Sequence, residues 1–264
     1  MMILLENRSL LKVSGNDAES FLHSQFSNDI RHIDEKKVQI NAYCQHQGKV
    51  IVIPWVIKKR DSYYLSIPSE MKDIVLSKLN MFKLMSQVDI EDFSKKIYQY
   101  GLIGESNTKS YQICDDLSLL TSREVLTDYH NNSLWEIECI KKILPEVYAS
   151  ISEKHIPQSF NLDINQFGVS FTKGCYPGQE VVARMHYLGN PKRRLFHFTS
   201  KFEAFVGDTL NVNDSRSLKS SGQVIRVAKD DNKFHFLAVF EAGQINNHIF
   251  LNNDQSKIVN LVHE

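Results

Sequence analysis

Residues 173–180 read Lys-Gly-Cys-Tyr-Pro-Gly-Gln-Glu (KGCYPGQE), within the longer stretch FTKGCYPGQEVVAR that spans residues 171–184. Two glycines and a proline interrupt the octapeptide, which indicates a loop that runs into a helix. Proline fixes its own φ and has no N–H to satisfy, so Pro177 suits the first position of that helix. The spacing therefore predicts a helix through residues 180–185, with Cys175 just before its N-terminus.

The position of Cys175 favours a reactive sulfur. The free N–H groups and the dipole of a helix N-terminus attract an anion, and Lys173 lies two residues away. Both features favour the thiolate, which is the nucleophilic form of cysteine. The alternative is an inert core cysteine beside a surface lysine, and the spacing of the residues leaves both interpretations open.

Glu180 and Arg184 are four residues apart and share one helix face. A solvated ion pair is the commonest meaning of such a pair. The functional alternative is a carboxylate aimed into a pocket, where it accepts two parallel N–H bonds from a heterocycle. Downstream, positive charge gathers in residues 184–197, which suits a carboxylate-rich ligand, RNA or an acidic partner; a charged interdomain hinge is the simplest reading.

Away from this stretch, the N-terminal part of the chain has the pattern of an α+β layer. Asn16 is predicted to cap a helix whose apolar residues recur from Ala18 to Ile30, with Glu19 in capping-box position. A β-meander is predicted over residues 38–67 and a helix from Ser69 with Met71, Ile74, Val75, Leu79 and Phe82 on one face. Two more strands are predicted at residues 87–90 and 97–103, whereas residues 105–132 carry no clear pattern.

The C-terminal part of the chain changes to a β pattern. A helix is predicted over residues 134–143, and residues 145–170 are expected to be irregular. Short strands separated by turn residues then suggest a small barrel or sandwich. We therefore predict an α+β body at residues 1–190, with a meander-and-helix subdomain at about 38–105, and a β-barrel domain at residues 191–264.

The composition and the absence of several motifs argue against some classes of protein. The chain of 264 residues has 31 basic and 31 acidic side chains, so wrapping of nucleic acid is not expected, although a local basic patch stays open. The N-terminus lacks the features of a signal peptide and no apolar run approaches a membrane span, which predicts a cytoplasmic protein. The four cysteines form no Cys-x-x-Cys pair, and no phosphate-binding or nucleophile-elbow motif is present.

The octapeptide at 173–180 resembles the signature of the YgfZ family, which comprises folate-binding relatives of the glycine cleavage T protein, an aminomethyltransferase. Further similarities follow in the family's order along the chain, from about residue 10 to 240. They lie at residues 15–22, 28–29, 44–50, 161–163, 181–184, 192–195 and 221–224. One departure is Pro177, where related sequences vary and where a proline stiffens the loop.

The resemblance implies a T-protein-like ring of two ferredoxin-like α+β layers plus a C-terminal β-barrel, with folate in the central hole. It also implies a role in making or maintaining iron–sulfur proteins, with effects on tRNA thiomethylation. The implied partners are folate and iron–sulfur proteins or their assembly machinery, without direct strong nucleic-acid binding and without a membrane. The implied cofactor is tetrahydrofolate or a one-carbon-substituted folate.

The same resemblance assigns site residues. Cys175 is expected to be the functional thiol and Lys173 a second catalytic residue that tunes the pKa of the thiol. Residues 192–194 are expected to receive the glutamyl tail of the folate, and no metal is expected. Two alternatives stay open, a folate-dependent aminomethyltransferase of T-protein type and a docking scaffold without a small ligand, so the resemblance does not fix whether the protein is an enzyme. The residues expected to contact folate are Gln179, Glu180, Arg184, Asn161, Asp163 and Asn28.

Overall fold

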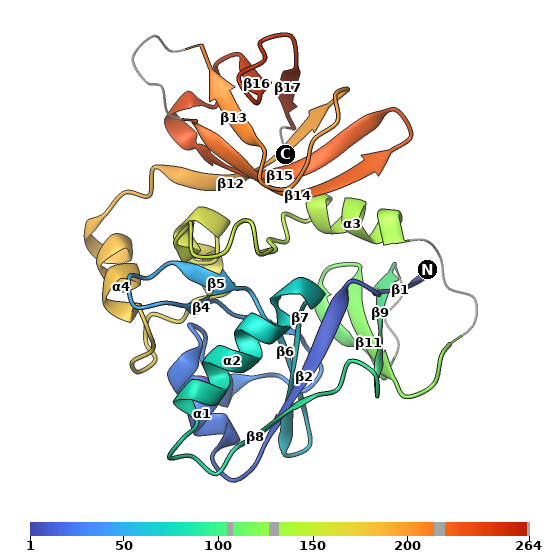
Figure 1. Cartoon of the computed structure of the whole chain (residues 1–264), viewed down its shortest axis with the longest axis vertical. Helices are drawn as coiled ribbons and strands as arrows, with labels where there is room; N and C mark the ends of the chain where they lie inside the picture. The colour runs from blue at the N-terminus through green and yellow to red at the C-terminus, as the bar shows by residue number, and fades with distance from the viewer. Residues whose placement is uncertain (105–107, 127–131, 214–219, 263–264) are drawn as a thin grey trace.

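The structure is a computed structural model that describes residues 1–104, 108–126, 132–213 and 220–262 (Figure 1). It has an α+β body and, at its C-terminus, a closed six-stranded barrel. The predicted α+β class with a C-terminal barrel is confirmed. Within the described residues, no helix is long and apolar enough to cross a membrane.

A five-stranded sheet lies at the centre of the body, in the strand order β3-β6-β7-β2-β8. Helices α1 (Ala18–Gln25) and α2 (Lys72–Phe82) pack on one face, where alternate strand residues such as Leu11, Val13 and Leu65 are buried. The strands are β2 (Arg8–Ser14), β3 (Gln39–Ile40), β6 (Trp55–Lys59), β7 (Ser62–Pro68) and β8 (Asp89–Asp92).

The other face of this sheet packs on a second sheet and on α3 (Asn132–Lys141). Trp55 of β6 meets Trp135 of α3 edge to face, with ring centroids 6.4 Å apart. Two of the second sheet's strands fall in residues 105–132, where the sequence predicted no element; residues 105–107 and 127–131 lie outside the described part. Its strands, in spatial order, are β1 (Met2–Leu4), β9 (Tyr98–Ile103), β11 (Leu117–Ser122) and β10 (Tyr111–Cys114).

The predicted cap of α1 is wrong. Asp17 is the N-cap residue and forms no side-chain cap, whereas the Asn16 amide donates to Gln87 Oε1 at 3.0 Å. Glu19 accepts a hydrogen bond from the hydroxyl of Tyr63 instead of reaching back to the cap. The side chains that were predicted to cap the helix are thus bound to residues distant in sequence, and α1 ends at Gln25.

The face of α2 is narrower than predicted. The short 3₁₀ helix η2 (Ser69–Met71) precedes it, and Met71, Val75 and Leu79 are buried. Ile74 and Phe82 are exposed because they lie at the edges of the apolar stripe. Ser69 therefore begins the helical segment without capping α2 through its side chain.

Between the body and the barrel lies the segment that was predicted to be irregular, residues 145–170. Its only helical turns are η3 (Pro157–Phe160) and η4 (Ile164–Gln166) among these described residues. It pairs with the hairpin of β4 (Tyr43–Cys44) and β5 (Val50–Val52), since Val50 N–H donates to His155 O at 2.8 Å and Glu153 N–H donates to Val50 O at 2.8 Å. Packing and main-chain bonds to its neighbours therefore hold this segment.

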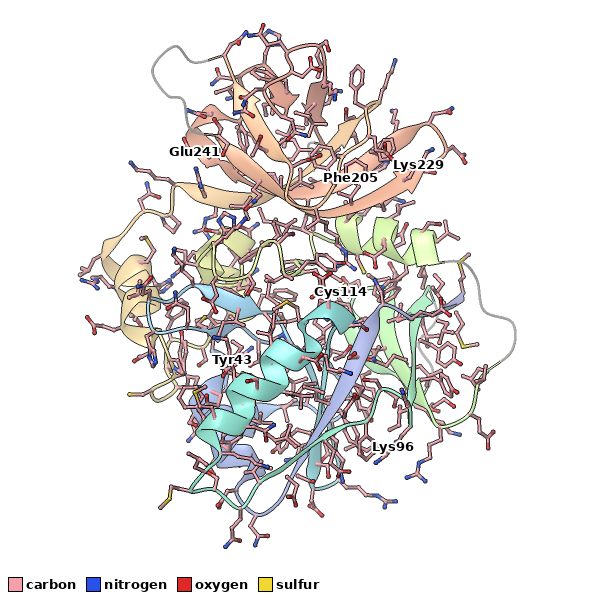
Figure 2. All side chains as sticks on the ribbon, in the orientation of Figure 1. Tyr43, Lys96, Cys114, Phe205, Lys229 and Glu241 are labelled. Atoms are coloured by element: carbon pink, nitrogen blue, oxygen red, sulfur yellow. The ribbon has the colours of Figure 1, made fainter. Side chains whose placement is uncertain are left out.

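The barrel has an aromatic core and a charged attachment to the body. Phe198, Phe236 and Phe240 pack inside it. The buried guanidinium of Arg226 donates to Glu136 Oε2 at 2.7 Å and to Leu144 O at 3.0 Å in the body. Side chains fill the space between the ribbon of the body and the ribbon of the barrel (Figure 2). The division of the chain at residue 190 stays a prediction.

The predicted C-terminal strands are present, and a 3₁₀ turn, η5 (Ala242–Gln244), follows β15. The barrel strands are β12 (Arg193–Ser200), β13 (Thr209–Val212), β14 (Gly222–Asp230), β15 (Lys233–Glu241), β16 (Ile249–Leu251) and β17 (Ile258–Leu261).

Candidate functional site

The loop at residues 171–178 leads into α4 (Gln179–Leu188). Gly178 is the N-cap residue and has a φ of 79°, in the left-handed region that glycine adopts without strain. Pro177 therefore lies outside the helix, and its predicted place as the first helical residue is wrong. The helix begins later because the chain turns at Gly178 before it starts to wind.

Gly178 is also in contact with the β4–β5 hairpin. A Cβ atom at this position would lie 2.5 Å from Gln45 O and 2.6 Å from Gly48 Cα. Gly48 itself has a φ of 75°, and a Cβ there would lie 3.0 Å from the Cβ of Val181. The two backbones touch, so this contact holds the N-terminus of α4 against the hairpin and requires glycine on both sides.

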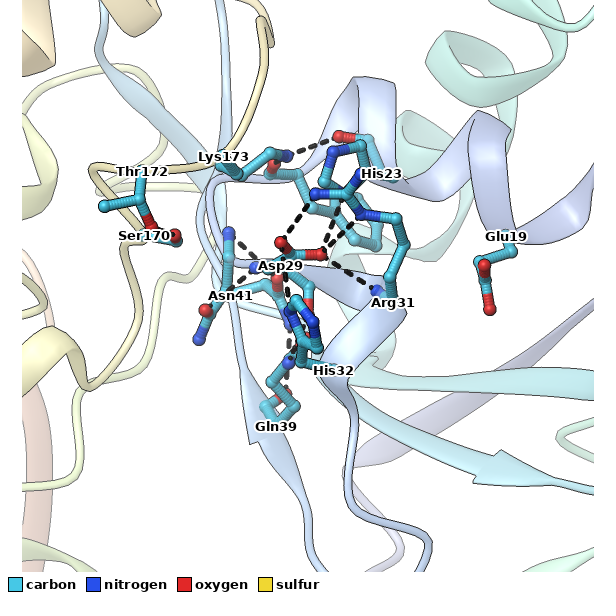
Figure 3. A network of polar contacts seen from close by, with 12 residues as sticks. Glu19, His23, Asp29, Arg31, His32, Gln39, Asn41, Ser170, Thr172 and Lys173 are labelled. Atoms are coloured by element: carbon cyan, nitrogen blue, oxygen red, sulfur yellow. Dashed lines mark hydrogen bonds and ion pairs between the residues drawn. The ribbon is translucent and has the colours of Figure 1, made fainter.

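Lys173 anchors the other end of the loop. Its side chain is buried, and its ammonium donates to the main-chain oxygens of His23 and Phe26, at the C-terminal end of α1 (Figure 3). It also lies 5.0 Å from the ring centroid of Tyr176. A cation at this end of a helix satisfies free carbonyls and the helix dipole. Lys173 therefore has a structural role that the sequence did not reveal.

Asp29 lies beside Lys173 at the centre of a polar network (Figure 3). Arg31 donates to its carboxylate from Nε at 3.0 Å and from Nη2 at 2.8 Å, and Nδ1 atoms of His23 and His32 lie 3.2 Å away. The hydrogen bond from Arg31 holds the pKa of Asp29 well below its usual value. Burial lowers the pKa of Lys173 to about 8, although the nearby Asp29 carboxylate opposes this shift.

Cys175 is the exposed one of the four free cysteines. Burial raises the pKa of Cys44, of Cys114 to about 11 and of Cys139 to about 12, so these thiols stay protonated at neutral pH. The negative charge of a Cys175 thiolate raises the pKa of Lys173, so the two predicted catalytic groups are within electrostatic reach. Between two anchored positions, the loop presents one accessible sulfur.

Asn161 and Asp163, two of the residues predicted to contact folate, form hydrogen bonds to the barrel and, among the described residues, do not line a cavity shared with the other predicted contacts. Asn161 has a φ of 58°, donates from Nδ2 to Leu195 O at 2.9 Å and accepts from Leu195 N–H at 3.2 Å. Asp163 accepts from Arg194 Nη1 at 2.6 Å, and the same Arg194 atom donates to Gln158 O at 2.9 Å. These side chains join the irregular segment to β12.

Asn28 and the basic segment at 192–194 were also predicted to contact folate, and most of their side chains are bonded within the protein. Asn28 donates to Ile40 O at 3.1 Å and accepts from Asp29 N–H at 2.9 Å, so its amide is also bonded within the protein. Arg193 donates to Ser220 O at 3.1 Å and to Glu241 at 3.3 Å. Of the basic segment at 192–194, only Lys192 has an exposed side chain.

Glu180 and Arg184 form the predicted same-face pair on α4. The distance from Arg184 Nη2 to Glu180 Oε1 is 3.7 Å, and the two side chains are 63% and 89% exposed, the arginine being the less exposed. The pair is solvated, and Gln179 beside it is half-buried. The carboxylate and the guanidinium thus remain accessible from outside.

Gln158 was missed by the sequence analysis. It is fully buried, donates from Nε2 to Val182 O at 2.8 Å and joins η3 to α4. Its Oε1 has no hydrogen-bond partner in the part of the chain that the structure describes. The irregular segment has no periodic pattern, so no signal in the sequence could have identified this residue.

Among the described residues, the surroundings of the loop hold an aromatic stack and no metal-binding cluster. In residues 1–104, 108–126, 132–213 and 220–262, no group of three or more His, Cys, Asp or Glu side chains is arranged to hold a metal ion. On α4, His186 stacks on Phe171 with ring centroids 3.6 Å apart, and this contact braces the start of the loop against the helix.

No protein-family model matches the sequence. An uncharacterized protein from Haemophilus influenzae is 30% identical over 233 residues, which cover 84% of this chain and 82% of that protein. The tRNA-modifying protein YgfZ of Colwellia psychrerythraea is 28% identical over 237 residues, covering 76% and 72% of the two chains. The tRNA-modifying protein YgfZ of Vibrio atlanticus is 28% identical over 257 residues, covering 86% and 79%.

A solved structure shares the fold. The glycine cleavage system aminomethyltransferase T from Bartonella henselae superimposes with a TM-score of 0.73 over all of this chain and 84% of its own, at 11% sequence identity. At this identity the similarity describes the fold alone. The predicted T-protein-like fold is therefore confirmed.

Proposed function

This chain belongs to the YgfZ family, and from that premise we propose that it binds a tetrahydrofolate-type cofactor and supports iron–sulfur proteins, with Cys175 as its functional thiol. Its named relatives are tRNA-modifying proteins, so the family is one related to tRNA modification. The finer proposal is that the iron–sulfur proteins it supports include enzymes of tRNA thiomethylation.

The observation that carries this proposal is the exposed sulfur of Cys175 on a loop fixed at both ends. Lys173 ties the loop to α1, and Gly178 ties it to the β4–β5 hairpin. A thiol that reacts with a partner has to be accessible, and a fixed loop lowers the entropy lost when the partner binds. The protein's own part in the chemistry is to hold this sulfur at a defined place on the surface.

The accessible residues fit a folate only in part. A folate has a ring N–H beside an amino group at one end and carboxylates at the other, which complement the Glu180 carboxylate and the Arg184 guanidinium. Asn28, Asn161 and Asp163 fit poorly because their side chains are bonded within the protein. We therefore narrow the proposed folate contacts to α4, and the bound cofactor would supply a carrier for a one-carbon unit.

A thermal-shift titration with tetrahydrofolate tests the cofactor. At a hundredfold excess over Kd, binding stabilises the native state by about 2.7 kcal/mol, which corresponds to a rise in Tm of about 5–10 °C for a chain of this size. The double variant Glu180→Gln with Arg184→Gln should lose most of this rise, whereas Cys175→Ala should keep it. An exposed matched control on the barrel is Glu203→Gln with Lys201→Gln, which should keep the full rise.

Two further results, one from that titration and one from an activity assay, would favour the alternative functions. A wild-type protein with no folate-induced rise in Tm would contradict the cofactor and favour a docking scaffold. Release of methylene-tetrahydrofolate in a reconstituted glycine cleavage assay would instead establish an aminomethyltransferase of T-protein type.

Complementation tests the thiol. In cells that lack their own YgfZ-family protein, Cys175→Ala should fail to restore tRNA thiomethylation, while the protein itself accumulates normally. The matched control is Cys114→Ala at a half-buried thiol, which should restore the modification. Full restoration by Cys175→Ala would remove the functional role of the sulfur and leave the folate proposal standing.

We also place the protein in the cytoplasm. All four cysteines are free, two of them are buried, and a reducing compartment keeps such thiols unpaired. Fractionation of cells that express the full chain with a tag would test this location.

A further inference from the structure

A polar groove, separate from the Cys175 loop, lies at the end of the central sheet that carries the β6–β7 turn. Its volume is about 590 Å³, and it lies between this turn and the end of β11. Among the residues that the structure describes, four cations line it: one in β2, one at the end of β6, one in the β6–β7 turn and one after β11. The lining includes Lys12, Lys59, Arg60, Ser62, Tyr64 and Arg123.

Strand alternation explains why polar residues gather there. Lys12 pairs with Tyr64 and Lys59 pairs with Ser62, all on the face opposite to α1 and α2. Closer to the centre of the molecule, the same face carries Trp55, which is buried against α3 and the second sheet. The covering layer ends before the outer residues, so the face changes from a buried core to an open groove.

Most of the cations in the groove have no ion-pair partner among the described residues. Lys59, Arg60 and Arg123 are exposed and form no ion pair with any residue that the structure describes. Lys12 Nζ lies 3.9 Å from Glu91 Oε1, and Asp61 is the one carboxylate among the described residues of the lining. In a chain with no net charge, this is a segregated basic surface that attracts anions.

The neutral groups of the groove narrow the kind of anion. Ser62 and Thr121 contribute hydroxyls that form no hydrogen bond with the described residues, and the two guanidinium groups match phosphate oxygens in pairs. The half-buried ring of Tyr64, held edge to face by Phe93 at 6.0 Å, forms an aromatic wall on which a base can stack. The volume is typical of a small-molecule site.

We propose that this groove binds the phosphate and base of a nucleotide, either free or within a single strand of RNA. This site is separate from the Cys175 loop, since Lys173 is anchored to α1 on the other side of the central sheet. The proposal therefore does not rest on folate binding or on the thiol. It also differs from the expectation based on net charge, because an average over the whole chain conceals a local cluster.

Fluorescence anisotropy with the full chain and a labelled single-stranded RNA of about 12 nucleotides, at about 50 mM salt, tests the groove. The charge reversal Arg60→Glu with Arg123→Glu should weaken binding about tenfold and reduce the salt slope by about 1.4, as expected for two lost phosphate contacts. The matched control is Lys201→Glu with Lys233→Glu, exposed barrel lysines whose reversal changes net charge equally and should weaken binding less than about twofold. The neutral variant Arg60→Gln with Arg123→Gln should give an intermediate loss, and it guards against misfolding of the reversed protein.

Competition with adenosine monophosphate separates the two sources of the nucleotide. Displacement of the RNA by the mononucleotide at equal affinity supports a free nucleotide, whereas affinity that grows with RNA length supports a strand; both results depend on the groove. Three results would overturn the proposal: no binding of either probe, equal weakening by the groove and control reversals, or equally tight binding of an oligoglutamate of the same charge.

Discussion

The octapeptide loop and the segment at residues 161–163 were predicted to serve the same site, yet they hold their polar groups in opposite ways. In the loop, main-chain contacts and Lys173 fix the chain, and the Cys175 sulfur stays exposed. In the other segment, the side chains of Asn161 and Asp163 themselves bond to β12. A side chain that fastens two parts of a protein together is poorly placed to bind a ligand.

The physical reason is the need to satisfy buried polar groups. An amide or carboxylate removed from water costs free energy unless it is hydrogen-bonded, so a buried Asn or Asp takes partners from the nearest backbone. A loop fixed through glycine contacts needs no side chain for that task. Each of the following predictions tests one side of this contrast.

The largest change in stability is expected at Gly178. Gly178→Ala places a Cβ against Gln45 O and Gly48 and forces a side chain onto a φ of 79°, so we expect a loss of about 2–4 kcal/mol in the free energy of unfolding. Gly174→Ala is the control in the same loop, because a Cβ there would meet no atom within 4 Å. Chemical denaturation of both variants measures the difference, and equal stability would mean that the hairpin does not fix the loop.

Asn161→Ala should lower the free energy of unfolding by about 2 kcal/mol. It removes both hydrogen bonds to Leu195, and alanine would have to adopt the left-handed φ of 58° that asparagine tolerates better. Asn161→Gly relieves the backbone strain and should recover part of the loss. Denaturation in the absence of folate is the measurement. Unchanged stability together with lost folate affinity would return Asn161 to the ligand site.

Lys173→Met should cost about 1 kcal/mol at neutral pH, since the His23 and Phe26 carbonyls lose their donor. The pKa of Lys173 is about 8 in the folded protein, below the ordinary 10.5. Between these two pH values the unfolded chain holds a proton that the native state has released. Raising the pH from 8 to 10.5 therefore stabilises the native wild type, and the difference in free energy of unfolding between wild type and Lys173→Met should grow.

Lys201→Met is the control for that pH series, because Lys201 is exposed on the barrel. The difference in free energy of unfolding between Lys201→Met and wild type should stay constant over the same pH range. A constant difference for Lys173→Met as well would show that the lysine is not buried in solution.

The smallest change in stability is expected on the surface of α4. Glu180→Gln and Arg184→Gln should each change the free energy of unfolding by less than about 0.5 kcal/mol, because the pair is solvated. Thermal denaturation without ligand measures this. A loss above about 1 kcal/mol would mean that the pair holds the fold, as Asn161 and Asp163 do, and would weaken its assignment to folate.

The sequence predicted the classes of elements more accurately than their ends. Short β-rich runs separated by turn residues identified the strands of the barrel, because strand and turn preferences are properties of neighbouring residues. The predicted caps at Asn16 and Pro177 were wrong, because Asn16 bonds to Gln87 and the turn before α4 is set by contact with Gly48. Such partners are distant in sequence and leave no local pattern.

The sequence also predicted some residues of the candidate site and missed others. The octapeptide identified Cys175 and Lys173, and the four-residue spacing identified the exposed Glu180–Arg184 pair. The sequence could not distinguish polar residues that bind ligands from those that join the barrel to the body. Gln158 in the irregular segment left no signal, since its role is defined only by its contact with α4.

By itself, then, the amino-acid sequence determined the α+β body, the C-terminal barrel and a glycine-rich loop that carries a cysteine, because local patterning and turn chemistry are properties of neighbouring residues. Only the tertiary structure decided that the loop's lysine is buried against the end of α1 while its cysteine is exposed. Burial and hydrogen bonding depend on which distant segments meet, and that is settled when the sheets, helices and barrel pack together.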